Sequence, residues 1–359
     1  MKNVCVIFGG TSTEHEVSRI SASNLIKNLD KKKYSLTVIE ISKKNEYFLY
    51  EYQDDDSFFN KIIANDNDLV KKQITPDIKM FVRMGIDVVF PIIHGTIGED
   101  GKLQGFLELC DIPYVGCDVL SSAVCMDKVL CKDILSKNGI AVADYLWFTC
   151  DEITKSLNNV IKSIENRFAY PVFVKPSECG SSVGINKAKN AESLKKALVF
   201  ASRFSRKVLV EEFIEGEELE VAVLGSYEKV SSSGVGQILS SNEFYDYSAK
   251  YLDGKSLTVM HPDIPDSSAR EIKKIAEKAF LIIGCYGMAR VDFFLTKGRK
   301  AIVNEINTIP GFTGISMYPK LWEQAGMTYS SLLTKLIMLA EERKKRYRFK
   351  LDYEGINND

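Results

Sequence analysis

The sequence predicts an α/β protein with more than one domain. Its 359 residues correspond to two or three domains of ordinary size. The apolar run from Val4 to Phe8 reads as a buried strand that ends at two glycines, and a helix to about Leu29 and a strand over 34–41 follow it. This order of strand, glycine loop, helix and strand is typical of a doubly wound parallel sheet.

The first domain is predicted to cover residues 1–122. Thr13 and Glu16 have the spacing of a capping box, which predicts that the first helix begins there. Residues 88–93 read as another buried strand, closed by His94 and a glycine. The polar segment from 50 to 80 is expected to form loops and a surface helix.

The second and third domains are predicted to cover residues 123–218 and 219–359. Expected helices lie at 126–137, 191–200, 267–284 and 329–344, and expected strands lie at 171–176, 208–210, 220–226, 230–239, 288–295 and 301–307. The helix over 267–284 is indicated by apolar residues at 3.6-residue spacing, which form one buried stripe.

The composition excludes several classes of protein. The chain has 47 basic and 48 acidic residues and a net charge of −1, which argues against nucleic-acid binding by bulk electrostatics and leaves only a local basic patch open. No run reaches the ~18 apolar residues that cross a bilayer, and the N-terminal apolar run is too short for a signal peptide. We therefore expect a cytoplasmic chain that binds neither membrane nor nucleic acid. Eight cysteines without a CxxC pair, with three histidines, indicate buried thiols rather than structural zinc.

A predicted hairpin carries the most informative residues. Alternation along 288–295 and 301–307, with the turn near residues 298–299, places Asp292 opposite Glu305 and Arg290 opposite Asn307. Opposed Cβ atoms lie about 5 Å apart, so two carboxylates on a buried face repel unless a cation lies between them. The same alternation places Val303 on the face of Glu305.

This arrangement predicts a Mg²⁺ site for a nucleotide phosphate. Hard divalent ions prefer oxygen ligands, which Asp292, Glu305 and Asn307 supply. Arg290 is then free to meet developing negative charge. The alternative is a solvated hairpin face on which both carboxylates are merely exposed.

Two further segments suggest anion binding. Lys175 ends a strand just before the small-residue loop 180–184, whose backbone N–H groups could cradle phosphate oxygens. Neither a Walker A loop nor a GxGxxG motif is present, and a plain hairpin turn is the alternative. The glycines of segment 308–319 allow backbone N–H groups to approach a ligand, and Ser316 could donate to a carboxylate; the alternative is an ordinary loop.

Two loops complete the candidate site. The segment 11–18 is a helix N-terminus at the carboxyl end of a strand, where ligands of open α/β sheets bind. Glu14 is not needed for capping there and could hold an ammonium group, whereas His15 is interpreted as structural. The segment 245–251 is rich in tyrosine and is predicted to be a lid that excludes water, with a surface loop as the alternative.

Together these segments resemble the D-alanine–D-alanine ligase family of ATP-grasp enzymes, over nearly the whole chain from Val4 to about Leu339. The matching stretches are 8–12, 14–18, 94–95, 98–101, 104–105, 126–128, 174–176, 180–184, 245–247, 249–251, 304–308 and 310–313. The resemblance implies a three-domain ATP-grasp fold, with a nucleotide site between two α+β domains. It also implies that ATP phosphorylates the carboxylate of one D-alanine and that the amine of a second D-alanine attacks the acyl phosphate.

The resemblance further implies roles for individual residues. Glu14 would hold the first ammonium group, and the ATP phosphates would be contacted by Lys128, Lys175 and Lys250. The adenosine pocket would be lined by Glu211, Phe213, Ile214 and Glu218, with Glu218 at the ribose hydroxyls. Two Mg²⁺ ions, with Mn²⁺ as a possible substitute, would be bound by Asp292, Glu305 and Asn307. The oxyanion would be stabilised by Arg290 and the N–H of Gly311, and the lid would be linked to the small-residue loop and to Glu14 by Tyr251 and Ser181. The substrates would also contact His94, Ser316 and Met317. A homodimer is implied as well.

Two departures and one specificity residue qualify the resemblance. Ser248 replaces an acidic residue often found in the lid, and Glu212 stands where a lysine is common. Met317 is similar to the residue of dipeptide-forming ligases, whereas ligases that accept D-lactate or D-serine commonly carry arginine there. D-alanine is therefore the expected second substrate. The alternatives are a D-alanine–D-serine ligase, another ATP-grasp amino acid ligase, or a nucleotide-binding protein without catalysis.

Overall fold

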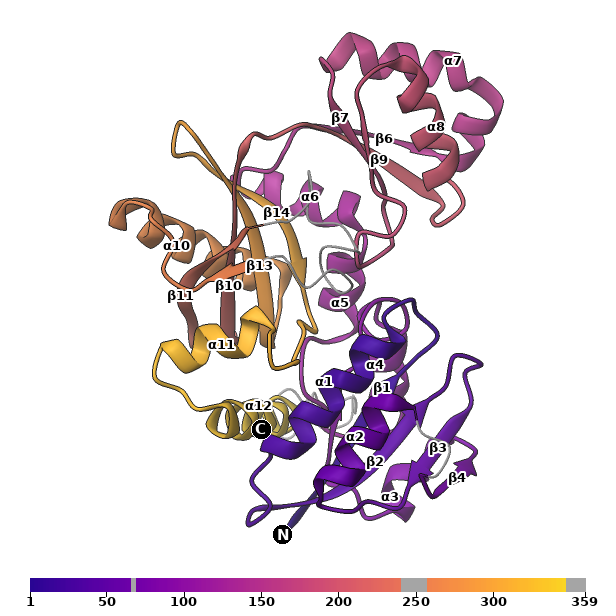
Figure 1. The fold of residues 1–359 in the computed structure, drawn as a ribbon, viewed down its shortest axis with the longest axis vertical. Helices are drawn as coiled ribbons and strands as arrows, with labels where there is room; N and C mark the ends of the chain where they lie inside the picture. The colour runs from indigo at the N-terminus through magenta and orange to yellow at the C-terminus, as the bar shows by residue number, and fades with distance from the viewer. Residues whose placement is uncertain (66–68, 240–256, 347–359) are drawn as a thin grey trace, which may run out of the picture.

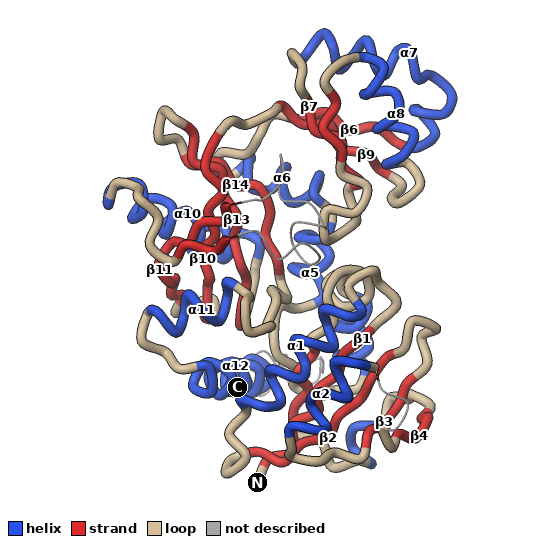
Figure 2. Tube along the Cα trace, in the orientation of Figure 1, coloured by secondary structure: helices blue, strands red, loops and turns tan. Residues whose placement is uncertain are grey.

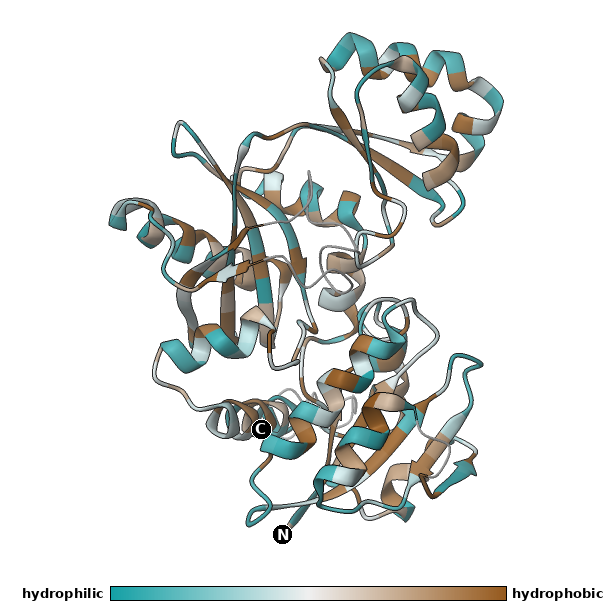
Figure 3. Cartoon of the chain, viewed as in Figure 1, coloured by the Kyte–Doolittle hydropathy of each residue, from teal (hydrophilic) through white to brown (hydrophobic). Residues whose placement is uncertain are grey.

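The computed structural model describes residues 1–65, 69–239 and 257–346, which form three sheets with helices packed on them (Figure 1). The three sheets follow one another along the long axis of the molecule, each with its own helices. Figure 2 distinguishes the strands from the helices that cover them. Hydrophobic residues concentrate in the strands and on the inner sides of the helices (Figure 3). In these described ranges, no helix combines the length and apolar character needed to cross a membrane.

The N-terminal sheet has the strand order β4-β3-β2-β1-β5. Its strands are β1 (Lys2–Gly9), β2 (Tyr34–Ile41), β3 (Tyr47–Tyr50), β4 (Lys71–Ile74) and β5 (Val88–Pro91). β1 pairs in parallel with β2 and β5, whereas β3 and β4 add antiparallel strands at one edge. The interpretation of segment 50–80 as loops and one helix is therefore wrong at β4, a short strand without an apolar pattern.

Helices cover both faces of this sheet, so the predicted doubly wound arrangement is confirmed. The helices are α1 (His15–Asn28), α2 (Asp56–Ala64), α3 (Met80–Arg83) and α4 (Lys102–Leu109). Val4 packs into one core with Leu25 of α1, and Cys5 packs into the opposite core with Leu107 of α4. Burial on both faces explains the unbroken apolar run of β1.

The predicted capping box at the start of α1 is wrong. Glu14 occupies the N-cap position, and its side chain makes no capping hydrogen bond. Glu16 instead forms an ion pair with Lys43. The N-cap therefore lies one residue after the Thr13 that the capping pattern predicted.

The second sheet is antiparallel, with the order β6-β9-β7-β8. It comprises β6 (Tyr145–Thr149), β7 (Val172–Pro176), β8 (Asn186–Ala188) and β9 (Lys207–Glu212), and it packs against α7 (Cys150–Arg167) and α8 (Ala191–Ala201). Both helices lie on the same side of the sheet (Figure 1), which leaves the other face free to contribute to a cavity.

The third sheet has the order β12-β11-β10-β13-β14. Its strands are β10 (Gly216–Gly225), β11 (Val230–Leu239), β12 (Leu257–Val259), β13 (Gly287–Thr296) and β14 (Ala301–Asn307). Its helices are α10 (Asp266–Ile283), α11 (Met317–Gln324) and α12 (Tyr329–Arg346). α10 and α11 both contact β10 and β11, and α12 contacts α1 and β5 of the N-terminal layer.

Two helices connect the layers. α5 (Val119–Met126) and α6 (Lys128–Lys137) pack against each other and against α10. α5 also contacts β14 of the third sheet. The sequence analysis expected only the second of these helices. The domain boundaries at residues 122 and 218 remain predictions.

Candidate active site

The predicted hairpin is β13 and β14, and its key register is confirmed. Asp292 is paired with Glu305, and Arg290 with Asn307. The turn is longer than the two residues assumed, because the N–H of Thr296 donates to the carbonyl of Lys300 at 3.1 Å. A register shift next to Asp292 compensates for this difference.

The register shift has a structural consequence. Phe293 pairs with Val303, so Asn304 is the extra residue of a β-bulge. Asn304 and Glu305 therefore both line the same cavity. Val303 turns instead into the core beneath α10, where it is 1% exposed. The expectation that Val303 shares the face of Glu305 is wrong, because a bulge breaks the two-residue alternation.

Arg290 lies at the centre of an acidic cluster. Its Nε is 2.7 Å from Oδ1 of Asp292 and 3.2 Å from Oε2 of Glu220, which faces Asp292 from β10. Burial lowers the pKa of Arg290, but Asp292 and Glu220 outweigh burial and raise it, so the guanidinium stays charged. The Nδ2 of Asn307 donates to Oδ2 of Asp292 at 3.0 Å.

The donor chemistry of this cluster fits Mg²⁺. Glu220, Asp292 and Glu305 bring three carboxylates to a site that holds one guanidinium, and Asn307 adds an amide oxygen. Hard divalent cations prefer such oxygen ligands. Within the described ranges, no group of three or more His, Cys, Asp or Glu side chains is arranged to hold a metal by itself. The predicted ligand set differs from such a group, because it has only two carboxylates, those of Asp292 and Glu305, and the amide of Asn307.

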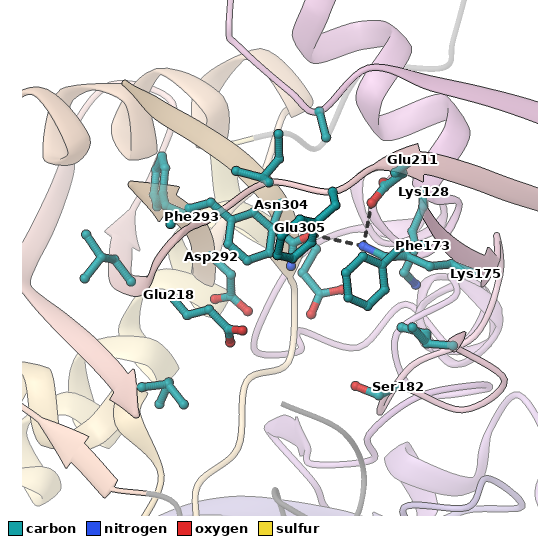
Figure 4. A pocket seen from close by; sticks show the side chains of 18 of the residues that line it. Lys128, Phe173, Lys175, Ser182, Glu211, Glu218, Asp292, Phe293, Asn304 and Glu305 are labelled. Atoms are coloured by element: carbon teal, nitrogen blue, oxygen red, sulfur yellow. Dashed lines mark hydrogen bonds and ion pairs between the residues drawn. The ribbon is translucent and has the colours of Figure 1, made fainter. Parts of the chain in front are cut away.

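A cavity of about 230 Å³ lies between the second and third sheets (Figure 4). Residues predicted for ATP and metal binding line it together: Lys128, Lys175, Glu211, Phe213, Ile214, Glu218, Asp292 and Glu305. The aromatic rings of Phe173 and Phe213, 6.1 Å apart, add apolar surface. The cavity thus combines an apolar side with two lysines and several carboxylates. Lys250 lies outside the described residues.

Lys175 is held in this cavity by two acceptors. Its Nζ lies 2.6 Å from Oε2 of Glu211 and 3.3 Å from Oδ1 of Asn304 (Figure 4). Lys132 approaches the other oxygen of Glu211 at 2.8 Å. Burial acts to raise the pKa of Glu211, but the two ammonium groups outweigh it and lower this pKa to about 2. Glu211 is therefore ionised at neutral pH and fixes both lysines.

A second cavity of about 930 Å³ lies between the N-terminal domain and the third sheet. Predicted substrate and catalytic residues line it together: Glu14, His94, Ser181, Arg290, Asn307, Gly311, Ser316 and Met317. It shares Lys128, Arg290 and Glu305 with the first cavity. The acidic cluster therefore lies at the junction of the two cavities.

Glu14 meets the small-residue loop of the second domain. A Cβ added to Gly95 would lie 2.6 Å from Oε2 of Glu14, and one added to Gly180 would lie 3.0 Å from it. Ser181 follows with φ of 51°, in the left-handed region. Its hydroxyl is buried and has no hydrogen-bond partner among the described residues. Tyr251 and the rest of segment 245–251 lie outside them.

His94 and the loop before α11 connect the domains. The ring nitrogens of His94 lie 3.0 Å from the carbonyl of Ile309 and 2.9 Å from Oγ of Ser21. Burial lowers the pKa of His94, which favours the neutral ring. Ser316 accepts from the N–H of Thr313 at 3.0 Å, and a Cβ on Gly311 would lie 2.6 Å from the Ser316 hydroxyl. A side chain at position 311 would therefore have to displace the hydroxyl of Ser316.

The sequence analysis missed three residues of the site, namely Glu99, Glu220 and Lys132. Glu99 accepts from the N–H groups of Gly95 at 2.7 Å and Ile309 at 3.0 Å. Burial and the nearby Glu14 raise its pKa to about 8. The alternation of β10 could have indicated Glu220, because it lies on the same face as Glu218. No local signal identifies Lys132 as the partner of Glu211.

Comparisons with known proteins agree with this geometry. Residues 3–117 match the family model "D-ala D-ala ligase N-terminus", and residues 134–338 match "D-ala D-ala ligase C-terminus". The D-alanine–D-alanine ligase of Acetivibrio thermocellus is 47% identical over 95% of this chain and 96% of its own length.

Solved structures are similar as well. The D-alanine–D-alanine ligase of Coxiella burnetii has a TM-score of 0.80 at 37% identity, over 96% of both chains. The VanG D-Ala:D-Ser ligase of Enterococcus faecalis has a TM-score of 0.84 at 36% identity, over 94% of this chain and 99% of that one. The chain belongs to the D-alanine–D-alanine ligase family of ATP-grasp enzymes.

Proposed function

We propose that this protein joins two D-alanines into D-alanyl-D-alanine, with ATP converted to ADP and phosphate, to supply peptidoglycan precursors. The observation that carries the proposal is the junction of the two cavities at Arg290 and Glu305. A carboxylate bound in the larger cavity can there meet a phosphoryl group bound in the smaller one. The product of that step is D-alanyl phosphate.

ATP occupies the smaller cavity. Phe213 and Ile214 contact the adenine, and Glu218 accepts from the ribose hydroxyls. Glu211 lines the same adenosine pocket. Lys128 and Lys175 contact the phosphates as point charges. Lys250 is assigned to the same phosphates by the family resemblance.

Asp292, Glu305 and Asn307 would hold Mg²⁺. The family resemblance implies two ions and Mn²⁺ as a possible substitute, and the oxygen donors of the site suit either metal. When bound, the metal neutralises phosphate charge and polarises the phosphoryl oxygens.

The first D-alanine binds by its ammonium group at Glu14. Arg290 and the N–H of Gly311 then stabilise the negative charge that develops when the second amine attacks. The family resemblance assigns Ser181 and Tyr251 to a link between Glu14 and the predicted lid. His94 keeps its ring neutral and fixes the loop that carries Gly311 through its contact with Ile309.

The second D-alanine binds near Ser316, which donates to its carboxylate, and beside Met317. The thioether of Met317 adds an apolar surface without a charge, which favours a methyl side chain over a hydroxyl. We also propose that the protein is a homodimer in the cytoplasm.

Product analysis tests this function. The protein is incubated with ATP, Mg²⁺ and a mixture of D-alanine, D-serine and D-lactate, and the products are separated by mass. D-alanyl-D-alanine should dominate, and phosphate release should exceed that with L-alanine. Equal phosphate release with L-alanine and with D-alanine would disprove ligation of D-alanine. A majority of D-alanyl-D-serine among the products would instead indicate a D-alanine–D-serine ligase.

A further inference from the structure

Gly236 of β11 lies against the side chain of Met317. A Cβ added to Gly236 would lie 2.7 Å from Sδ and 3.0 Å from Cε of Met317, and 3.2 Å from Cδ2 of Leu321. Real Cβ atoms essentially never approach another heavy atom within 3.0 Å. The thioether therefore occupies the space that any other residue at position 236 would fill.

Met317 cannot avoid such a contact by moving its backbone. It is the first residue of α11, and Ser316 before it is held by two contacts with Thr313. Its side chain is 3% exposed and packs with Ile238 and Leu321 in the core of the third sheet. The thioether can therefore move only toward the larger cavity, which Met317 and Ile238 already line.

We infer that Gly236 is a positioning residue for specificity: the missing side chain lets Met317 lie back against β11 and leaves room for the second substrate. The inference rests on the proposed function, since Met317 is the proposed neighbour of the second D-alanine. Gly236 itself does not touch the substrate. Its effect passes through the thioether.

A larger residue at position 236 should therefore reduce the volume that is open to the second substrate. In Gly236→Ala, the added methyl displaces the thioether toward the cavity. A pocket that changes by one methyl-sized group alters selectivity by about 10-fold or more. We expect the KM for the second D-alanine to rise about 10-fold, and D-serine, which is larger, to lose more than D-alanine. The KM values for ATP and for the first D-alanine should stay unchanged.

Gly234 provides a matched control on the same strand. A Cβ at Gly234 would meet no atom of the described residues within 4 Å. Gly234→Ala likewise adds one methyl group to a glycine of β11, without touching Met317. It should keep the wild-type KM for both amino acid sites.

Met317→Ala completes a double-mutant cycle. Because it removes Sδ and Cε, Gly236→Ala should have no further effect on the second KM in that background. An equal effect of Gly236→Ala with and without the thioether would overturn the inference, as would equal KM values for Gly236→Ala and Gly234→Ala. If Gly236→Ala alone does not fold, the double variant should fold, and a failure of both would also overturn it. Wild-type protein that forms no D-alanyl-D-alanine would instead refute the proposed function.

Discussion

The guanidinium of Arg290 faces the carboxylate of Asp292 through two contacts, Nε to Oδ1 and Nη2 to Oδ2, each 2.7 Å long. The two residues lie on the same face of β13, so strand geometry alone brings them together. Bidentate pairs of this kind fix the orientation of both groups. The arginine is thereby held beside the proposed metal ligands and at the junction of the two cavities.

Asp292→Asn should abolish most of the activity and leave the fold intact. The substitution removes one negative charge from the proposed metal site, while Arg290 keeps Glu220 at 3.2 Å. We expect kcat for phosphate release to fall about 100-fold or more, in line with the loss of one electrostatic contact in an active site. Asp266→Asn, an exposed change at the start of α10, is the control. Equal activity of the two variants would contradict the assignment of Asp292.

Glu211→Gln should destabilise the protein, and the loss should depend on pH. The substitution leaves Lys132 and Lys175 buried without their carboxylate, which costs about 3–5 kcal/mol of unfolding free energy at neutral pH. The folded pKa of Glu211 is about 2, below its ordinary value of 4.5. The stabilisation is therefore fully present above pH 4.5 and is lost as the pH falls toward 2.

Urea unfolding at pH 7, 5 and 3 measures this difference. The gap between wild type and Glu211→Gln should be largest at pH 7 and 5 and should narrow at pH 3. Glu192→Gln removes an exposed carboxylate that pairs with Lys196, and it should have little effect at any of these pH values. A gap that stays constant with pH would show that charge is not the cause.

Glu99→Gln should change how stability depends on pH between pH 5 and 8, because the pKa of Glu99 is shifted upward and not downward. The pKa of Glu99 is raised from 4.5 to about 8, first by burial and then by Glu14. The folded protein therefore holds a proton that the unfolded chain releases above pH 4.5, and stability falls as the pH rises toward 8. Glutamine imitates the protonated form. Unfolding between pH 5 and 8 should show a smaller decline for the variant, and equal slopes would contradict the buried, protonated carboxyl.

Met317→Arg should shift the choice of second substrate. A guanidinium in the larger cavity repels the ammonium group of an amino acid and can donate to a hydroxyl oxygen. We expect the rate ratio of D-serine or D-lactate to D-alanine to rise about 10-fold in steady-state competition assays. Met338→Arg, at an exposed position of α12, adds the same charge away from both cavities. An unchanged ratio in Met317→Arg would remove Met317 from the specificity site.

The sequence alone determined the elements whose information is local. The apolar runs of β1 and β5 and the helix stripe of α10 follow from side-chain periodicity, which needs no knowledge of distant residues. The pairing of Asp292 with Glu305 also followed from alternation along two neighbouring strands. That prediction held because the longer turn and the bulge at Asn304 offset one another.

Only the tertiary structure decided contacts between residues far apart in the chain. The buried bridge of Glu211 with Lys132 and Lys175, the approach of Glu14 to Gly180 and the space that Gly236 leaves for Met317 all join separate elements. The protonation of Glu99 likewise depends on burial and on Glu14, which become neighbours of its carboxyl only in the folded chain. Periodicity fixes which face a side chain occupies, whereas packing between elements fixes what that face meets and how strongly its charge is perturbed.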